Sequence, residues 1–118
     1  MPFTAILKEL VENVDGAEGA IFLEADGEAV QWFAKGDAEL LKLKAAYVAL
    51  TTNLCRDVSQ LANLTTQGTM LIAYEGASFL VNDLTNGYMV MLEMQPMANI
   101  GQAMHRIKAT TEKLQREL

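Results

Sequence analysis

The methionines are the first residues whose type and spacing suggest chemistry. Five of the seven lie in the stretch NGYMVMLEMQPMANIGQAMHR, from Asn86 to Arg106. They are Met89, Met91, Met94, Met97 and Met104. Thioether sulfur suits monovalent copper, and Met94 and Met97 have the Met-x-x-Met spacing of some soft-metal sites. However, strand alternation already explains the spacing of Met89 and Met91, and methionine fills irregular gaps in cores. We therefore interpret these residues as core packing and predict no metal site.

A nucleophilic site would have to use Cys55 and His105, the only cysteine and the only histidine of the chain. Cys55 falls among small residues on a predicted helix, where a cysteine behaves as a small hydrophobe. No acidic residue is identifiable that would orient His105 as a base. No GxxxxGK[ST] or GxGxxG motif follows a strand, so the sequence predicts no phosphate-binding loop. We expect no catalytic residue and no cofactor, and hence no enzyme.

The charge balance restricts the class of partner. The net charge is -6, from 9 basic and 15 acidic residues, and such a surface repels nucleic acid and anionic membranes. No apolar run approaches the roughly 18 residues of a membrane span. The N-terminus shows no secretion signal, and a lone cysteine suits a reducing compartment. We expect one cytoplasmic domain over 1–118 that neither inserts into membranes nor binds nucleic acid.

Apolar spacing and turn residues predict the elements that carry these residues. They are a helix over 4–14, a hairpin over 18–34 with its turn at Asp26-Gly27, a long helix from Asp37 to about Leu61, three strands over 68–94, and a last helix that begins at Asn99. The strand segments AIFL and MVML are apolar on both faces. An antiparallel sheet with one wet face would alternate instead, so helices should cover both faces. The predicted fold class is α+β, with five antiparallel strands.

The long helix carries two apolar stripes, one rotated by a single residue from the other. The first stripe has large side chains, and we predict that it packs on the sheet. It comprises Leu43, Tyr47, Leu50, Leu54, Val58 and Leu61. The second has mostly small side chains, and we interpret it as a candidate self-association face. It comprises Leu41, Ala45, Val48, Thr52, Cys55 and Ser59. The alternatives are that the second stripe packs within its own chain or is mildly apolar surface.

The order of elements resembles that of the Roadblock (dynein light-chain) family, and of its bacterial MglB-type members most of all. The residues that carry the resemblance are LKELVENVDGAEGAIFLEADGEAV (7–30), GTMLIAYEGASFLVNDLTNGYMVMLE (68–93) and NIGQAMHRI (99–107). The likeness covers nearly the whole chain. The Val-Asp-Gly at 14–16 departs from the Val-Pro-Gly or Val-Pro-Asp turn that is frequent in the family.

The resemblance implies a profilin-like sandwich and a non-enzymatic homodimer that regulates a Ras-like small GTPase. Members pair the strand after the long helix with its twin, which is Gly68 to Tyr74 here, and set the two long helices side by side. The expected dimer interface is Leu41, Ala45, Val48, Thr52, Cys55, Met70 and Ile72. MglB-type members are similar to GTPase-activating proteins that lend no arginine, whereas other members only dock GTPases or join motor and signalling assemblies. The GTPase-binding candidates are Lys42, Tyr47, Asn53 and Arg56.

Two other functions stay open at this point. The chain could be a structural adaptor in a motor or signalling assembly that has no GTPase partner. It could also be a small-molecule sensor, although bulky side chains fill the predicted sheet faces.

Overall fold

The computed structural model describes residues 2–63 and 68–118. The elements, in chain order, are α1 (Pro2–Glu12), β1 (Ala17–Leu23), β2 (Ala29–Ala34), α2 (Ala38–Leu61), β3 (Thr69–Ala73), β4 (Ser78–Asp83), the 3-10 turn η1 (Thr85–Gly87), β5 (Met89–Met94) and α3 (Ile100–Glu117). This order confirms the predicted α-β-β-α-β-β-β-α pattern, with η1 as an addition. None of the described helices is long and apolar enough to cross a membrane.

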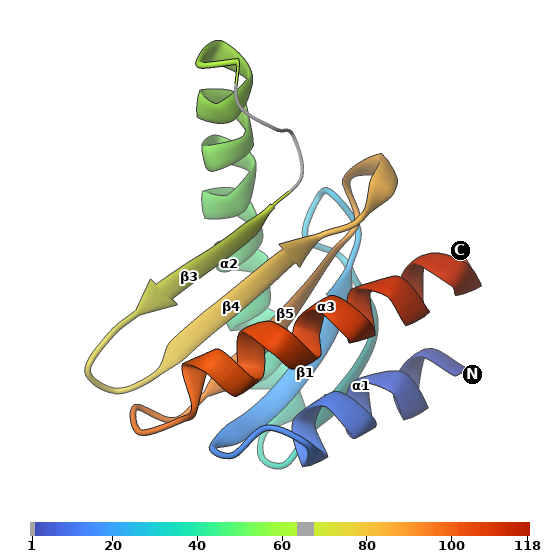
Figure 1. Cartoon of the computed structure of the whole chain (residues 1–118), viewed down its shortest axis with the longest axis vertical. Helices are drawn as coiled ribbons and strands as arrows, with labels where there is room; N and C mark the ends of the chain where they lie inside the picture. Colours follow the sequence, from blue (N-terminus) through green and yellow to red (C-terminus); the bar gives the residue numbers. More distant parts are fainter. Residues whose placement is uncertain (1, 64–67) are drawn as a thin grey trace.

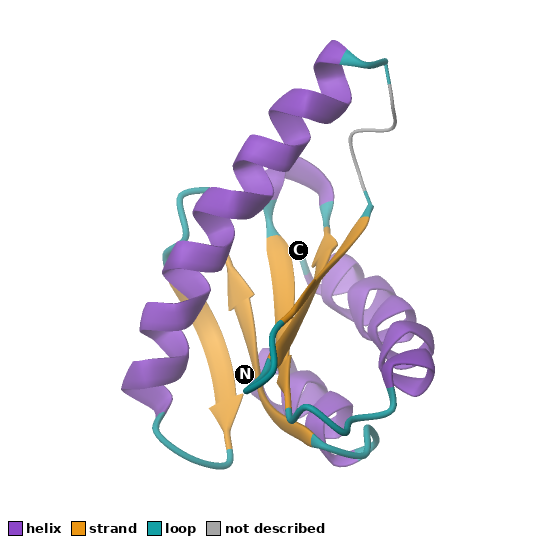
Figure 2. Ribbon diagram, turned by 90° about the vertical axis from the view of Figure 1, so that its left-hand side faces the viewer, coloured by secondary structure: helices purple, strands orange, loops and turns teal. Residues whose placement is uncertain are grey.

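The five strands form one antiparallel sheet in the order β2-β1-β5-β4-β3. Helices α1 and α3 cover one face of the sheet, and α2 lies on the other (Figures 1 and 2). Each face carries its own apolar cluster, one under α1 and α3 and one under α2. The central strands β1 and β5 contribute to both clusters, which is why AIFL and MVML are apolar throughout. The prediction of helices on both faces is confirmed.

Local residue chemistry sets the turns and the helix starts. Gly27 has a φ of +89°, and the Asp26 side chain accepts a bond from the Glu28 amide at 3.0 Å. Only glycine adopts a positive φ at almost no steric cost. The Asp26-Gly27 pair therefore determines the position of this hairpin turn. Asp37 caps α2 by accepting from two amides of its first turn, and Asn99 caps α3 by accepting from the Gln102 amide.

Three of the five clustered methionines are core residues. Met89, Met91 and Met94 are fully buried in β5, which confirms the packing interpretation for them. Met97 is 93% exposed and Met104 is partly exposed, so neither of these two fills the core. The core interpretation was therefore too broad, because Met97 lies in the loop after β5 and Met104 lies on an exposed side of α3.

The structure reverses the predicted faces of α2. Leu41, Ala45, Val48 and Thr52, expected to form a dimer interface, are instead buried against their own sheet. The large stripe that was expected to pack on the sheet is exposed along its whole length. The reason is size. The sheet face under α2 is already filled by side chains such as Met89 and Met91, so small helix residues allow the closer approach.

Candidate interaction surface on the long helix

The exposed face of α2 is a continuous row of large apolar side chains, which we call the outer stripe. It comprises Leu43, Tyr47, Leu50, Leu54, Val58 and Leu61, each between 56 and 86% exposed. Successive members are three or four residues apart, so they lie one above the other along the helix. Single exposed leucines are ordinary, whereas contiguous exposed apolar patches are typical of interaction sites.

The C-terminal part of α2 reaches past the end of the sheet (Figures 1 and 2). Thr52 is the last fully buried residue of the helix. Beyond it, the described part of the chain leaves Leu54, Val58 and Leu61 more than 60% exposed. Most of the stability of a helix in a protein comes from packing of its apolar face, so this segment would gain from a second surface.

A polar cluster fixes the direction of this projecting segment. Arg56 Nη2 lies 2.5 Å from Asp83 Oδ1, and Arg56 Nη1 donates to the carbonyl oxygen of Gly87 at 3.3 Å. Asn53 Nδ2 donates to the carbonyl oxygen of Ala25 at 2.8 Å, and its Oδ1 accepts from Arg56 at 3.0 Å. The Arg56 and Asp83 side chains are 16% and 10% exposed. The cluster therefore joins α2 to the β1–β2 turn and the β4–β5 connection.

Strand β3 forms one edge of the sheet beside this helix. Within the described residues it pairs only with β4, so its other side offers free backbone N–H and C=O groups. Met70 and Ile72 pack partly against the cluster under α2, which places these two expected interface residues on the α2 side. Leu71 is 44% exposed on the opposite face.

A shallow groove of about 280 Å³ lies between α2 and β3. Its walls are Lys44, Tyr47, Val48, Thr51, Ile72, Tyr74 and Phe79. Tyr47 and Tyr74 are both more than 60% exposed, and Lys44 is held by an ion pair with Glu93 at 2.7 Å. The groove thus makes the outer stripe and the β3 edge one continuous surface with aromatic rings at its centre.

The four GTPase-binding candidates differ in how freely they present functional groups. Tyr47 is 66% exposed and belongs to the outer stripe. Lys42 Nζ lies 3.6 Å from the centroid of the Trp32 ring and 3.1 Å from Glu39. Asn53 and Arg56 are engaged in the polar cluster described above. The structure therefore spreads these four residues over more than one side of α2 and does not gather them at one point.

Nucleophilic chemistry finds no support in the positions of Cys55 and His105. Cys55 is exposed on α2 in the single chain, and its expected place in a dimer interface stays a prediction. His105 is exposed on α3, across the sheet from α2. The two residues therefore lie on helices that pack on opposite faces of the sheet. The expectation that the chain has no nucleophilic site stays a prediction.

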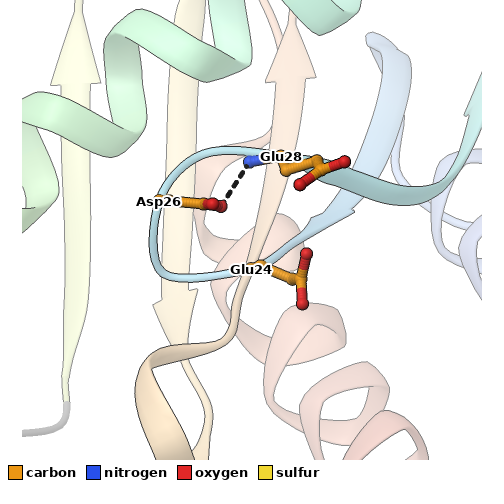
Figure 3. A group of neighbouring side chains, drawn as sticks. All are labelled: Glu24, Asp26 and Glu28. Carbon is orange, nitrogen blue, oxygen red and sulfur yellow. Dashed lines mark hydrogen bonds between the residues drawn. The ribbon is translucent and has the colours of Figure 1, made fainter.

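Three carboxylates lie together at the β1–β2 turn, where the sequence analysis singled out none as a ligand. Oxygen atoms of Glu24, Asp26 and Glu28 come within 4.8 Å of one another (Figure 3). Asp26 uses its carboxylate to accept from the Glu28 amide, which accounts for its place in the turn. Asp26 and Glu28 are exposed to solvent, so the group is explained by local turn structure.

The comparison with solved structures identifies the architecture. A Roadblock/LC7 domain from Streptomyces avermitilis superposes with a TM-score of 0.86 over 96% of this chain and 94% of its own, at 13% identity. The chain has the Roadblock/LC7 fold. MglB from Myxococcus xanthus matches with a TM-score of 0.87, over 98% of this chain and 94% of its own, at 11% identity.

A third match extends the Roadblock/LC7 likeness to another genus. The gliding protein MglB from Thermus thermophilus has a TM-score of 0.84 over 95% of this chain and 84% of its own, at 16% identity. No protein-family model matches the sequence, and no curated protein matches it. The Roadblock/LC7 likeness thus lies in the arrangement of elements and not in a shared set of side chains.

The sequence analysis missed the outer stripe as a surface, although it identified each of its members. The available signal was that α2 has two apolar stripes, while a helix on one sheet face needs only one. One stripe had to be exposed, and residue size decided which.

Proposed function

We propose that this protein is a non-enzymatic homodimeric binding module that regulates or scaffolds a Ras-like small GTPase. The single observation that carries the dimer is the outer stripe of α2, a row of six large exposed apolar side chains beside a free sheet edge. In the dimer, two α2 helices lie side by side and cover each other's stripe. Burial of one exposed leucine contributes roughly 1.5–3 kcal/mol, so several such contacts outweigh the entropy of association.

The β3 edge supports the same twofold arrangement. Two antiparallel copies of β3 would satisfy each other's free backbone groups and extend the sheet across both protomers. The groove between α2 and β3 borders both the outer stripe and the β3 edge, which supports a dimer that uses the two together. In this dimer Met70 and Ile72 flank the new strand pair, and the outer stripe takes the place of Leu41, Ala45, Val48 and Thr52 as the helical seam.

The GTPase partner rests on the Roadblock resemblance and on the similarity to MglB structures. The acidic protein would receive the GTPase on the joint surface of the two α2 helices. Tyr47 is the side chain suited to direct contact, since Lys42 is held over Trp32 and beside Glu39. Asn53 and Arg56 act indirectly by holding α2 in place. Because the Arg56 guanidinium is bound to Asp83, it is not available to act as an arginine finger.

Sedimentation velocity tests the dimer. Leu50→Glu and Leu54→Glu each place a charge on the outer stripe and should shift the dimer to monomer at micromolar concentration without loss of helical circular dichroism. Gln60→Glu adds the same charge to an exposed position of α2 outside the stripe and should leave the dimer intact. A wild-type monomer, or dimers that persist in both stripe variants, would exclude this interface.

The partner is tested with the dimer and its Ras-like GTPase in GDP-bound and GTP-bound forms. Co-elution and faster GTP hydrolysis are expected with the wild type and the Gln60→Glu control, and both should disappear with Leu54→Glu. If no nucleotide state forms a complex, the GTPase assignment is wrong. Capture from a native extract of a dominant partner without a P-loop would instead favour the structural adaptor.

A further inference from the structure

Strand β2 forms the second edge of the sheet, opposite β3. Within the described residues it pairs only with β1, and each of its six residues is half-buried. The Lys35 amide donates to the Glu18 carbonyl oxygen at 2.9 Å, so Lys35 directs its backbone toward β1. Hydrogen-bonding direction alternates along a strand, and the backbone groups of Trp32 and Ala34 therefore point outward.

A lysine lies over an aromatic ring on each face of this edge. On one face, Lys8 of α1 places its Nζ 6.0 Å from the centroid of Phe33, which packs against the cluster under α1 and α3. On the other, Lys42 of α2 places its Nζ 3.6 Å from the centroid of Trp32, which packs against the cluster under α2. Two ammonium groups thus flank the outward-facing backbone, one above and one below the sheet.

These two lysines lie at one edge of a chain whose net charge is -6. An incoming strand would direct neighbouring side chains to opposite faces, so two adjacent acidic residues would meet Lys8 and Lys42 at once. We propose that the β2 edge binds an extended acidic segment of a partner protein, which adds a strand to the sheet. Main-chain hydrogen bonds supply affinity in this mode, and the two lysines supply selection for carboxylates.

A second copy of the chain does not fit this edge as well. A twofold pairing centred on Trp32 would bring Lys42 of both copies to the same place, and like charges there are repulsive. Lys42 already pairs with Glu39 at 3.1 Å, but the Glu39 side chain is 83% exposed. Exposed pairs of this kind contribute little, so an incoming carboxylate can replace Glu39 at small cost.

The binding test uses Trp32, the only tryptophan of the chain, as an intrinsic fluorescence reporter. The probe is a short capped peptide of alternating valine and threonine with two adjacent glutamates at its centre. The matched probe has lysines in place of the glutamates. We expect saturable binding of the glutamate peptide, weakened by salt, and about tenfold weaker or no binding of the lysine peptide. Equal affinity for both peptides, or no binding of either, overturns the proposal.

Variants separate the charge contribution from the backbone contribution. The double variant Lys8→Glu/Lys42→Glu should reverse the preference between the two peptides, with binding read from peptide anisotropy. Ala34→Pro removes an outward N–H, which an edge strand tolerates, and should abolish binding, whereas Ala34→Val retains the N–H and should bind. Unchanged binding by Ala34→Pro would exclude strand addition. The β2 and β3 edges lie at opposite ends of the sheet, so this result is independent of the proposed dimer.

Discussion

Arg56 and Asp83 form an ion pair with a separation of 2.5 Å between Nη2 and Oδ1, and it joins the projecting half of α2 to the end of β4. The two residues are 27 positions apart in the chain. Arg56 also donates to Asn53 Oδ1 and to the carbonyl oxygen of Gly87. The guanidinium and the bond from Asn53 to Ala25 therefore tie the part of α2 beyond Thr52 to the rest of the described fold.

Removal of this guanidinium should destabilise the fold. Arg56→Ala leaves the Asp83 carboxylate without its ion-pair partner at 10% exposure, and we expect a loss of about 2–4 kcal/mol in the free energy of unfolding. Urea denaturation followed by circular dichroism measures it. Asp57→Ala changes an exposed charge on the next residue and should stay within about 0.5 kcal/mol of the wild type. Equal losses in both variants would show that the ion pair contributes nothing specific.

Two leucines of α2 test the corrected assignment of its faces. Leu41 is 2% exposed under the helix and Leu54 is 67% exposed on the outer stripe. Leu41→Ala should cost about 2–5 kcal/mol of unfolding free energy, as a core truncation does. Leu54→Ala should cost less than about 1 kcal/mol when both are measured in the monomeric Leu50→Glu background. The opposite ranking would restore the large stripe as the inner face.

The sequence predicted the elements better than it predicted their faces. Asp26-Gly27, Asp37 and Asn99 act through neighbours in the chain, so their turn and caps were readable from local sequence. The inner face of α2 depends on how much room the sheet leaves, which is a tertiary property. The lysines over Phe33 and Trp32 likewise come from two helices far from each other in sequence. Apolar periodicity therefore identified both stripes of α2 but did not indicate which of them packs on the sheet.

The turn after α1 offers a prediction about backbone conformation. Gly16 has a φ of +89°, and a Cβ there would lie 2.7 Å from the Cβ of Ala98 and 2.8 Å from its Cα. Gly16→Ala combines an unfavourable φ with a clash against backbone, and we expect a loss of about 2–4 kcal/mol. Thermal unfolding measures this as a lower Tm. Gly36→Ala is the matched control, because a Cβ at Gly36 meets nothing within 4 Å. A Tm for Gly16→Ala equal to that of this control would contradict the tight turn.

The contact between α1 and α3 should make stability depend on acid. Lys113 Nζ lies 2.5 Å from Glu9 Oε1, and its hydrogen bond and charge lower the pKa of Glu9 below the ordinary value. A carboxyl whose folded pKa is depressed binds its proton more readily in the unfolded chain. Its contribution to stability is therefore present above the unfolded pKa of about 4.3 and is lost as the pH falls through the folded pKa.

Glu9→Gln removes this titration, so the variant should be less stable than the wild type near neutral pH and the gap should close in acid. The measurement is the urea midpoint at a series of pH values from neutral to below the folded pKa of Glu9. Glu12→Gln, an exposed position at the end of the same helix, is the control for loss of a negative charge. Lys113→Gln should mimic Glu9→Gln, because either change removes the same pair. A gap between wild type and Glu9→Gln that stays constant with pH would mean that the ion pair does not contribute to folding.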